Sequence, residues 1–149
     1  DEFKLLLGDR TAEDIKIAIG SAYDMNERSK ALMRGRDLIN GLPKELMVND
    51  FEIREALVRS VKILVNAIRA TVEQTPPELV ADIMERGIVL SGGGSLLRGI
   101  DTLFQKELGI GVKIVDEPLS CVVRGTGLIA EKFNEYKYIF NNFSKIKNR

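Results

Sequence analysis

The sequence contains no histidine and no tryptophan, and its only cysteine is Cys121. Without histidine, the chain cannot assemble a Ser-His-Asp or Cys-His catalytic site, or a histidine-ligated metal site, from its own residues. A single cysteine excludes an intramolecular disulfide and fits a reducing compartment such as the cytoplasm. These absences exclude several classes of hydrolase and metalloenzyme that would depend on this chain alone.

The chain also lacks an excess of charge and a long hydrophobic run. Its 22 Lys and Arg residues equal its 22 Asp and Glu residues, so net charge does not favour nucleic acid as a partner. No run approaches the roughly 20 apolar residues that span a bilayer. With 149 residues, 44% hydrophobic and 30% charged, the composition is that of one globular domain or two small lobes. The charged start and the uncapped leucines at 5–7 lead us to expect a fragment.

One segment, residues 87–99, combines a short apolar run with three consecutive glycines. The run at 88–90 predicts a buried strand, and a helical pattern begins near Ser95. At such a strand–turn–helix junction the first helical N–H groups lack partners, and glycine lets a phosphate approach the backbone closely. A phosphate site and an ordinary glycine-rich turn both remain open on this pattern alone.

A second candidate site lies on a helix predicted for residues 12–22, with Thr11 as its N-cap. Glu13, Lys16 and Gly20 recur on one face of this helix and would be able to line a ligand. The alternative is an exposed Glu–Lys pair at i, i+3, which contributes a few tenths of a kcal/mol. Spacing alone favours the exposed pair.

The rest of the chain alternates strand and helix patterns. Strands are expected at 30–36, 46–48, 88–91 and 112–115, and further helices at 49–72, 77–85, 95–108 and 120–133. The first two strands are expected to form an antiparallel pair. The longest helix begins with a capping sequence at Asn49 and carries an apolar stripe expected to face a core. The stripe consists of Ile53, Leu57, Val61, Leu64, Ile68 and Val72.

Glycines also mark the later part of the chain. Gly109 is expected to end the helix that follows the glycine turn. Gly125 and Gly127 interrupt a helical pattern, which suggests a backbone packed closely against a neighbour. The aromatic and basic tail at 134–149 is compatible with contact to a membrane surface or with a frayed helix that covers the adjacent lobe, and of these two we favour the second.

Several segments, in the right order, resemble the MreB family of actin-like ATPases, whose members determine bacterial rod shape. They are Arg10–Ile17 with Gly20–Ala22, Arg34–Leu38, Gly41–Lys44, Thr75–Leu79, Gly87–Gly99 and Gly125–Gly127. The resemblance runs from about Leu5 to Ala130. It implies an α/β fold that is a fragment of the actin-like (ribonuclease H-like) ATPase fold, with the small lobe and part of the adjacent larger lobe.

The resemblance also implies a nucleotide site and a cellular role. Glu13 and Lys16 would contact the ribose and adenine of ATP, which the full-length protein would bind with Mg²⁺. The phosphate–adenosine side would be held by Gly92, Gly93, Gly94 and Ser95. The whole protein would be a self-associating filament subunit in the cytoplasm, at the inner face of the cell membrane. Its partners would be the membrane and cell-wall synthesis proteins.

Two phosphate loops typical of the family, with Asp-Leu-Gly-Thr and Asp-Ile-Gly-Gly-Gly-Thr type sequences, are not found in this chain. They would supply the metal-linked carboxylates and the site of the catalytic water. We therefore expect a slow ATPase only in the full-length protein and assign no catalytic or metal-binding residue here. Residues 1–22 and 73–133 are assigned to the larger lobe, 23–72 to the small lobe and 134–149 to a C-terminal tail.

Two alternatives remain open. One is half of a small-molecule kinase with the actin fold, such as a sugar or acetate kinase, and the other is an interaction module that does not depend on nucleotide. An Asp-Ile-Gly-Gly-Gly-Thr type sequence upstream of Asp1 would favour the filament ATPase, and its absence from a complete gene product would favour the interaction module. On any of these readings a two-stranded sheet remnant with open edges is expected to favour self-association over coverage by the tail.

Overall fold

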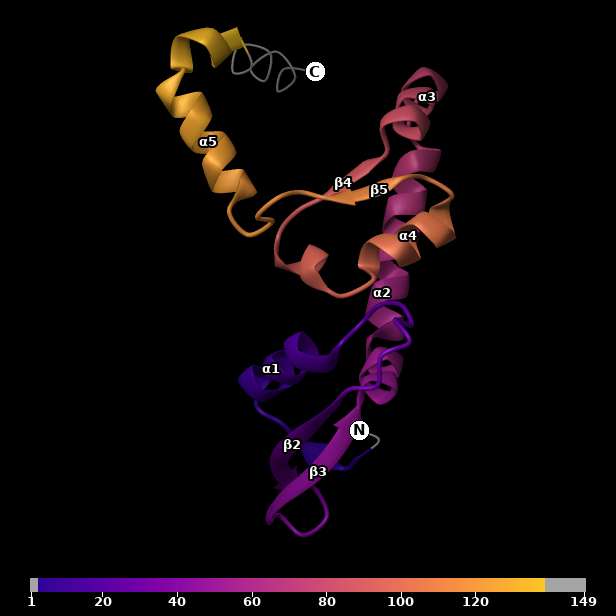
Figure 1. The fold of residues 1–149 in the computed structure, drawn as a ribbon, viewed down its shortest axis with the longest axis vertical. Helices are drawn as coiled ribbons and strands as arrows, with labels where there is room; N and C mark the ends of the chain where they lie inside the picture. The colour runs from indigo at the N-terminus through magenta and orange to yellow at the C-terminus, as the bar shows by residue number, and fades with distance from the viewer. Residues whose placement is uncertain (1–2, 139–149) are drawn as a thin grey trace.

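The computed structural model describes residues 3–138, which form an elongated molecule built along one long helix (Figure 1). In chain order the elements are β1 (Leu5–Leu6), α1 (Asp9–Ile19), β2 (Lys30–Asp37), β3 (Pro43–Asn49), α2 (Asp50–Glu73), α3 (Pro77–Arg86), β4 (Ile88–Leu90), the 3₁₀-helix η1 (Gly93–Leu96), α4 (Ile100–Leu108), β5 (Val112–Ile114) and α5 (Cys121–Glu131). One group of elements lies at the lower end of α2, and a second lies beside its upper half.

The lower group is an antiparallel sheet in the order β1-β2-β3, covered by α1. Because side chains alternate across a strand, one face of the β2–β3 pair points inward. Its inward residues pack with α1 in a first core, here called the sheet cluster. The buried members are Leu5, Ile15, Ile19, Met33 and Val48. The predicted antiparallel pair is thus confirmed, with both strands somewhat longer than expected.

Helix α2 begins with a complete capping box, as the sequence predicts. The Glu52 N–H donates to Asn49 Oδ1 at 3.0 Å, and the Asn49 N–H donates to Glu52 Oε2 at 2.8 Å. Its 24 residues correspond to about 36 Å of helix at 1.5 Å per residue. This length lets α2 pack against both groups of elements.

The upper group is built on a parallel pair, β4 and β5, with η1 and α4 in the connection between them. Its core, here called the helix cluster, joins α2 to α4 through buried Val61, Val65, Ile100 and Phe104. Gly87, with φ +80°, precedes β4. A Cβ there would lie 2.5 Å from the Gly111 carbonyl oxygen, so only glycine lets these backbones approach.

Two predicted helix starts are wrong. Helix α1 begins at Asp9 rather than Ala12, because the Ala12 N–H already donates to Gly8 O at 3.1 Å. Gly8, not Thr11, is therefore the N-cap. After the glycine turn, the expected helix from residue 95 is replaced by η1. A left-handed Gly99 (φ +71°) then separates η1 from α4.

The apolar stripe of α2 is confirmed at Ile53, Leu57, Val61 and Ile68, which pack in or against the two clusters. Val65, not Leu64, faces the helix cluster, and Leu64 is about half exposed. The expected close packing at Gly125 and Gly127 is also wrong for the described residues, because a Cβ at either would meet no atom within 4 Å. Tail residues 139–149 lie outside the described part of the chain.

The predicted lobes stay a prediction, although the two clusters group the elements differently. The first predicted segment, 1–22, contains α1, whose buried residues belong to the sheet cluster rather than to the cluster that holds β4. The second half of α2, assigned to the small lobe, packs in the helix cluster. Each cluster therefore combines residues that are assigned to different lobes: the sheet cluster joins α1 to β2 and β3, and the helix cluster joins α2 to α4.

The end of β2 carries a carboxylate with an altered pKa. Asp37 Oδ1 accepts the Ile39 N–H at 2.8 Å, and Asp37 Oδ2 lies 3.1 Å from Lys44 Nζ. The Ile39 N–H first, and then Lys44, stabilise the charged form and lower the pKa of Asp37 below its ordinary value. This group therefore links the stability of the β2–β3 connection to pH.

We expect Asp37→Asn to lower the free energy of unfolding at pH 7, with the difference from wild type shrinking below about pH 4. A carboxylate with a lowered folded pKa stabilises fully above its unfolded pKa and loses that contribution as pH falls through the folded one. Denaturant titration of both proteins from pH 7 to pH 2 measures this, with the exposed Asp116→Asn as control. A difference that does not change with pH would contradict the assignment.

Candidate functional site

Helix α1 places Glu13 and Lys16 together on its exposed side. Lys16 Nζ lies 2.5 Å from Glu13 Oε2, and the two side chains are 40% and 54% exposed, respectively. An ion pair this exposed contributes little to stability. The pair predicted from the i, i+3 spacing is therefore present, and both side chains are accessible to a ligand.

The glycine turn follows β4 and is held by Ser95. The Ser95 Oγ donates to Gly92 O at 2.7 Å, the Ser95 N–H reaches the same oxygen at 3.2 Å, and Ser95 is buried. Gly92 has φ +80° and ψ 172°, a region that is essentially restricted to glycine. The hydroxyl of Ser95 thus shapes the turn from inside.

The backbone of this turn is open on its outer side. A Cβ at Gly92 or Gly94 would meet no atom within 4 Å, and one at Gly93 would meet only Leu119 Cδ2 at 3.4 Å. Space and the absence of side chains are what a phosphate or sugar needs to approach a backbone. The residues present therefore fit the nucleotide that the sequence predicts here.

The two predicted segments are joined through Arg98. The Ala22 N–H donates to Arg98 O at 2.7 Å, beside a parallel bridge between Ser21 and Arg98. Arg98 Nε donates to Gly20 O at 3.1 Å. The stretch that follows α1 thus runs beside the stretch that follows η1, although the two are far apart in sequence. The structure brings the two candidate segments into one region.

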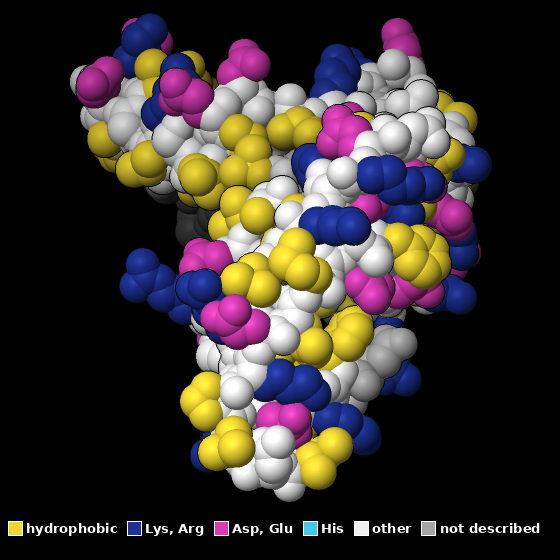
Figure 2. All heavy atoms as spheres, turned by 60° about the horizontal axis from the view of Figure 1, so that its bottom comes forward, with side chains coloured by type: hydrophobic (Ala, Val, Ile, Leu, Met, Phe, Trp, Pro, Cys, Tyr) yellow, Lys and Arg dark blue, Asp and Glu magenta, His cyan; other side chains and the backbone are white. Residues whose placement is uncertain are grey.

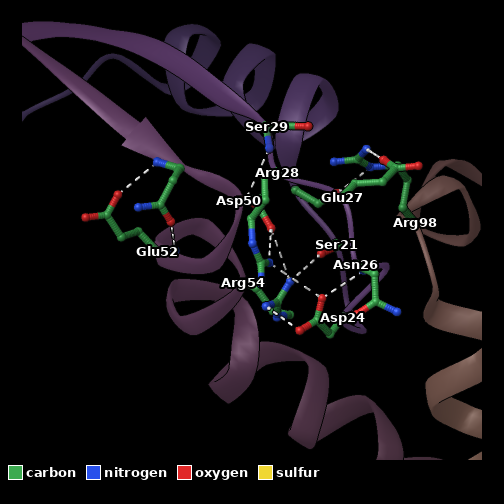
Figure 3. Close-up of polar contacts among 12 residues, drawn as sticks. Ser21, Asp24, Asn26, Glu27, Arg28, Ser29, Asp50, Glu52, Arg54 and Arg98 are labelled. Atoms are coloured by element: carbon green, nitrogen blue, oxygen red, sulfur yellow. Dashed lines mark hydrogen bonds and ion pairs between the residues drawn. The ribbon is translucent and has the colours of Figure 1, made fainter.

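A polar network missed by the sequence analysis surrounds Arg54 at the start of α2 (Figure 3). The Arg54 side chain is only 11% exposed, and its guanidinium lies 3.6 Å from a carboxylate oxygen of Asp24 and 3.6 Å from one of Asp50. Arg54 also donates to Ser21 Oγ at 3.3 Å. Nearly buried charges need such partners, so this cluster fixes the α1–β2 connection on α2.

Two cavities of the described residues lie along α2, away from the glycine turn. One, of about 290 Å³, is bounded by α2 and α4 and includes Arg54 and Arg69. The other lies around Asp24 and Asp50. Neither cavity is lined by Glu13, Lys16 or the turn. Glu13, Lys16 and the turn are therefore an open surface in this chain.

Residues 3–138 contain no group of three acidic or cysteine side chains placed to hold a metal ion. In the same residues, no helix has the length and hydrophobicity needed to cross a membrane.

Residues 1–138 match the MreB/Mbl protein family. The chain is 43% identical to the cell shape-determining protein Mbl of Bacillus subtilis over 134 residues, covering 90% of this chain and 40% of that protein. It is 48% identical to the cell shape-determining protein MreB of Escherichia coli, covering 85% and 36%, respectively. The chain thus spans about 40% of the length of the curated relatives it matches.

Solved structures give the same result. The crystal structure of MreB5 of Spiroplasma citri bound to ADP superposes with a TM-score of 0.86 at 36% identity, over 92% of this chain and 41% of that one. The AMPPNP-bound form of MreB5 gives the same TM-score and identity, over 95% and 42%. The fold therefore corresponds to part of these proteins.

We expect Gly92→Ala to lower the free energy of unfolding by about 1–3 kcal/mol, because a Cβ is strained at this φ and ψ. Gly94→Ala, in the same turn but without a positive φ and with free space around it, serves as the matched control and should change stability far less. Thermal or denaturant unfolding of both variants decides. Equal effects from the two substitutions would show that the turn does not have the described backbone.

Proposed function

This chain belongs to the MreB/Mbl protein family, and we propose that it is the C-terminal half of an actin-like, ATP-binding filament subunit that determines cell shape by organising cell-wall synthesis. It has the α/β fold of part of the MreB structures, as the resemblance in the sequence predicts. The matched proteins are cell shape-determining proteins, and none of these matches favours the small-molecule kinase alternative.

The observation that carries nucleotide binding is the junction of α1 with the glycine turn. Glu13 and Lys16 lie exposed on one segment, the open backbone of 92–94 lies on the other, and Arg98 connects the two. The superposed MreB5 structures are bound to ADP and AMPPNP. We assign Glu13 and Lys16 to the ribose and adenine, and the turn with Ser95 to the phosphate–adenosine side.

The proposed chemistry is divided between this chain and an upstream half. The present residues bind and orient the nucleoside. Mg²⁺ and the attacking water would be held by the two phosphate loops of that half. The full-length protein would then be a slow ATPase, and the present chain alone would not hydrolyse ATP. An Asp-Ile-Gly-Gly-Gly-Thr type sequence upstream would favour this proposal over a nucleotide-independent interaction module.

The cellular setting follows the family resemblance. The filament would lie in the cytoplasm at the inner face of the membrane, with membrane and cell-wall synthesis proteins as partners. Residues 1–22 and 73–133 would form part of the larger lobe and 23–72 the small lobe, with 134–149 as a C-terminal tail. In the full-length protein the sheet begun by β4 and β5 would be extended by strands of the upstream half.

The proposed self-association is supported by exposed apolar side chains. Figure 2 shows such side chains along the length of one face, most densely in its upper half. Around the start of α5, Leu119, Val122 and Val123 are 73%, 68% and 66% exposed, respectively. Within the described residues β4 and β5 pair only with each other, so both present an open edge. Open edges and apolar patches are typical interaction surfaces.

In the full-length protein we expect Lys16→Ala and Gly93→Val each to weaken ATP binding without unfolding the protein. Lys16 is an exposed residue of α1, so its loss changes stability little. The valine would place a branched side chain where the nucleotide approaches. Calorimetric titration with Mg-ATP measures the affinity, and Lys62→Ala on the exposed side of α2 is the control. Unchanged affinity in either variant would contradict the assignment of that residue.

The isolated chain should bind Mg-ATP weakly or not detectably, because half of the proposed phosphate contacts would come from the upstream half. Each 1.4 kcal/mol of lost contact lowers affinity about tenfold. The same titration tests this on the chain as given. A micromolar dissociation constant would show that these 149 residues form a sufficient nucleotide site.

We expect the isolated chain to associate with itself in a concentration-dependent manner. The double variant Val122→Lys, Val123→Glu should weaken association while keeping the net charge at zero. The matched control, Leu38→Glu with Ile39→Lys in the exposed β2–β3 connection, should not weaken it. Sedimentation equilibrium over a concentration series measures this. A monomer at every concentration would favour coverage of the apolar surface by the chain's own tail.

A further inference from the structure

We propose that Arg98 is a positioning residue that sets the distance between the two halves of the nucleotide site. This inference rests on the nucleotide site proposed above and adds a residue that does not itself touch the nucleotide. Arg98 lies between the glycine turn and α4, and both its backbone and its side chain hold the segment that follows α1.

The contacts of Arg98 form one connected path. Its Nε donates to Gly20 O at 3.1 Å, and the Gly20 N–H donates to Lys16 O at 2.8 Å. On the other side, the neighbouring Leu97 N–H reaches Gly94 O at 3.3 Å. Arg98 and its covalent neighbour Leu97 together thus connect the helical turn that carries Lys16 with the glycine turn.

The guanidinium of Arg98 is fixed at a second point. Its Nη1 lies 3.0 Å from Glu27 Oε2 (Figure 3). A planar guanidinium donates in fixed directions, so contacts to a backbone carbonyl and a carboxylate together orient it more firmly than either contact alone. Arg98 is therefore anchored at both ends of the segment 20–27.

Gly99 allows the segment to lie directly against this part of the chain. It has φ +71°, and an added Cβ would lie 2.9 Å from Tyr23 Cβ and 2.9 Å from Met25 Sδ. Residues 98 and 99 therefore contact the segment over several consecutive residues. The junction between residues 98–99 and the segment 20–27 therefore involves backbone as well as side-chain contacts, and does not depend on one long side chain alone.

The junction matters because the two halves of the site belong to different cores. Helix α1 packs in the sheet cluster, while β4, which leads into the glycine turn, packs against the helix cluster. A ligand that touches both halves binds best when their separation is fixed beforehand, because less ordering is then needed on binding. Arg98 supplies a direct bond between the halves.

The chain offers a matched control in Arg69. Its Nη2 donates to the backbone oxygen of Glu107 at 3.3 Å and lies 4.0 Å from Glu107 Oε2. These contacts join α2 to α4. Like Arg98, Arg69 therefore bonds a carbonyl and a carboxylate on a distant element. Unlike Arg98, it contacts neither α1 nor the glycine turn in any of these bonds.

The test uses Arg98→Met and Arg69→Met in the full-length protein, which keep an unbranched stem and remove the charge. We expect Arg98→Met to weaken Mg-ATP binding about tenfold and Arg69→Met less than twofold, at comparable melting temperatures. Arg98→Lys should give an intermediate loss, because its ammonium is a point charge that replaces the planar set of guanidinium N–H donors. If Arg98→Met does not fold, Arg98→Lys is the variant that tests the proposal. Equal affinities for the variants at 98 and 69 would overturn the proposal.

Hydrogen exchange gives a readout that a general loss of stability would not produce. In Arg98→Met without nucleotide, the amides of residues 20–27 should exchange faster, and saturating Mg-ATP should restore their protection. Exchange that stays fast with ATP bound would overturn the positioning role. Lys16→Ala separates the two proposals: if it leaves ATP affinity unchanged, the nucleotide site itself is wrong. If it weakens binding while Arg98→Met does not, only the role of Arg98 is wrong.

Discussion

The packing of one face of α2 against two separate cores is the constraint on which the rest of this structure depends. Near its start, Ile53 packs against the sheet cluster, and about two and three turns later Val61 and Val65 are buried in the helix cluster. Between them Arg54 ties the α1–β2 connection to the helix. The orientation of each group of elements is therefore set by the residues of α2 against which it packs.

Much of this architecture could be predicted from local pattern. The apolar spacing and the Asn49 capping box gave α2, because a long amphipathic helix carries its own signal in 3.6-residue periodicity. Gly109 ended α4 as expected, in a left-handed conformation that favours glycine. The errors arose where two signals compete. Thr11 is a good N-cap residue, but the chain already turns into helix at Gly8, and the run after Ser95 looks helical although Gly99 interrupts it.

The site was only partly accessible to the same reasoning. Glu13 and Lys16 could be paired because three residues separate them on one helix. Arg98 and Arg54 could not, since their partners at Gly20 and Ser21 are 78 and 33 positions away. Contacts at such separation depend on how elements pack, which a periodic pattern does not encode. The only trace in the sequence was that Arg98 lies within the glycine-rich segment 87–99, without any indication of its partner.

The division into two cores has a consequence for how the chain unfolds. Each cluster buries few side chains, and their shared element is a helix whose surface between Ile53 and Val61 is largely exposed. Cooperative units of this kind open separately when the contacts between them break before the cores themselves. If the contacts of Arg54 and Arg98 break first, the chain melts in two steps rather than one, and its calorimetric enthalpy exceeds the van't Hoff value. A ligand seated on both groups would merge the steps, so nucleotide would act as the missing part of a single cooperative core.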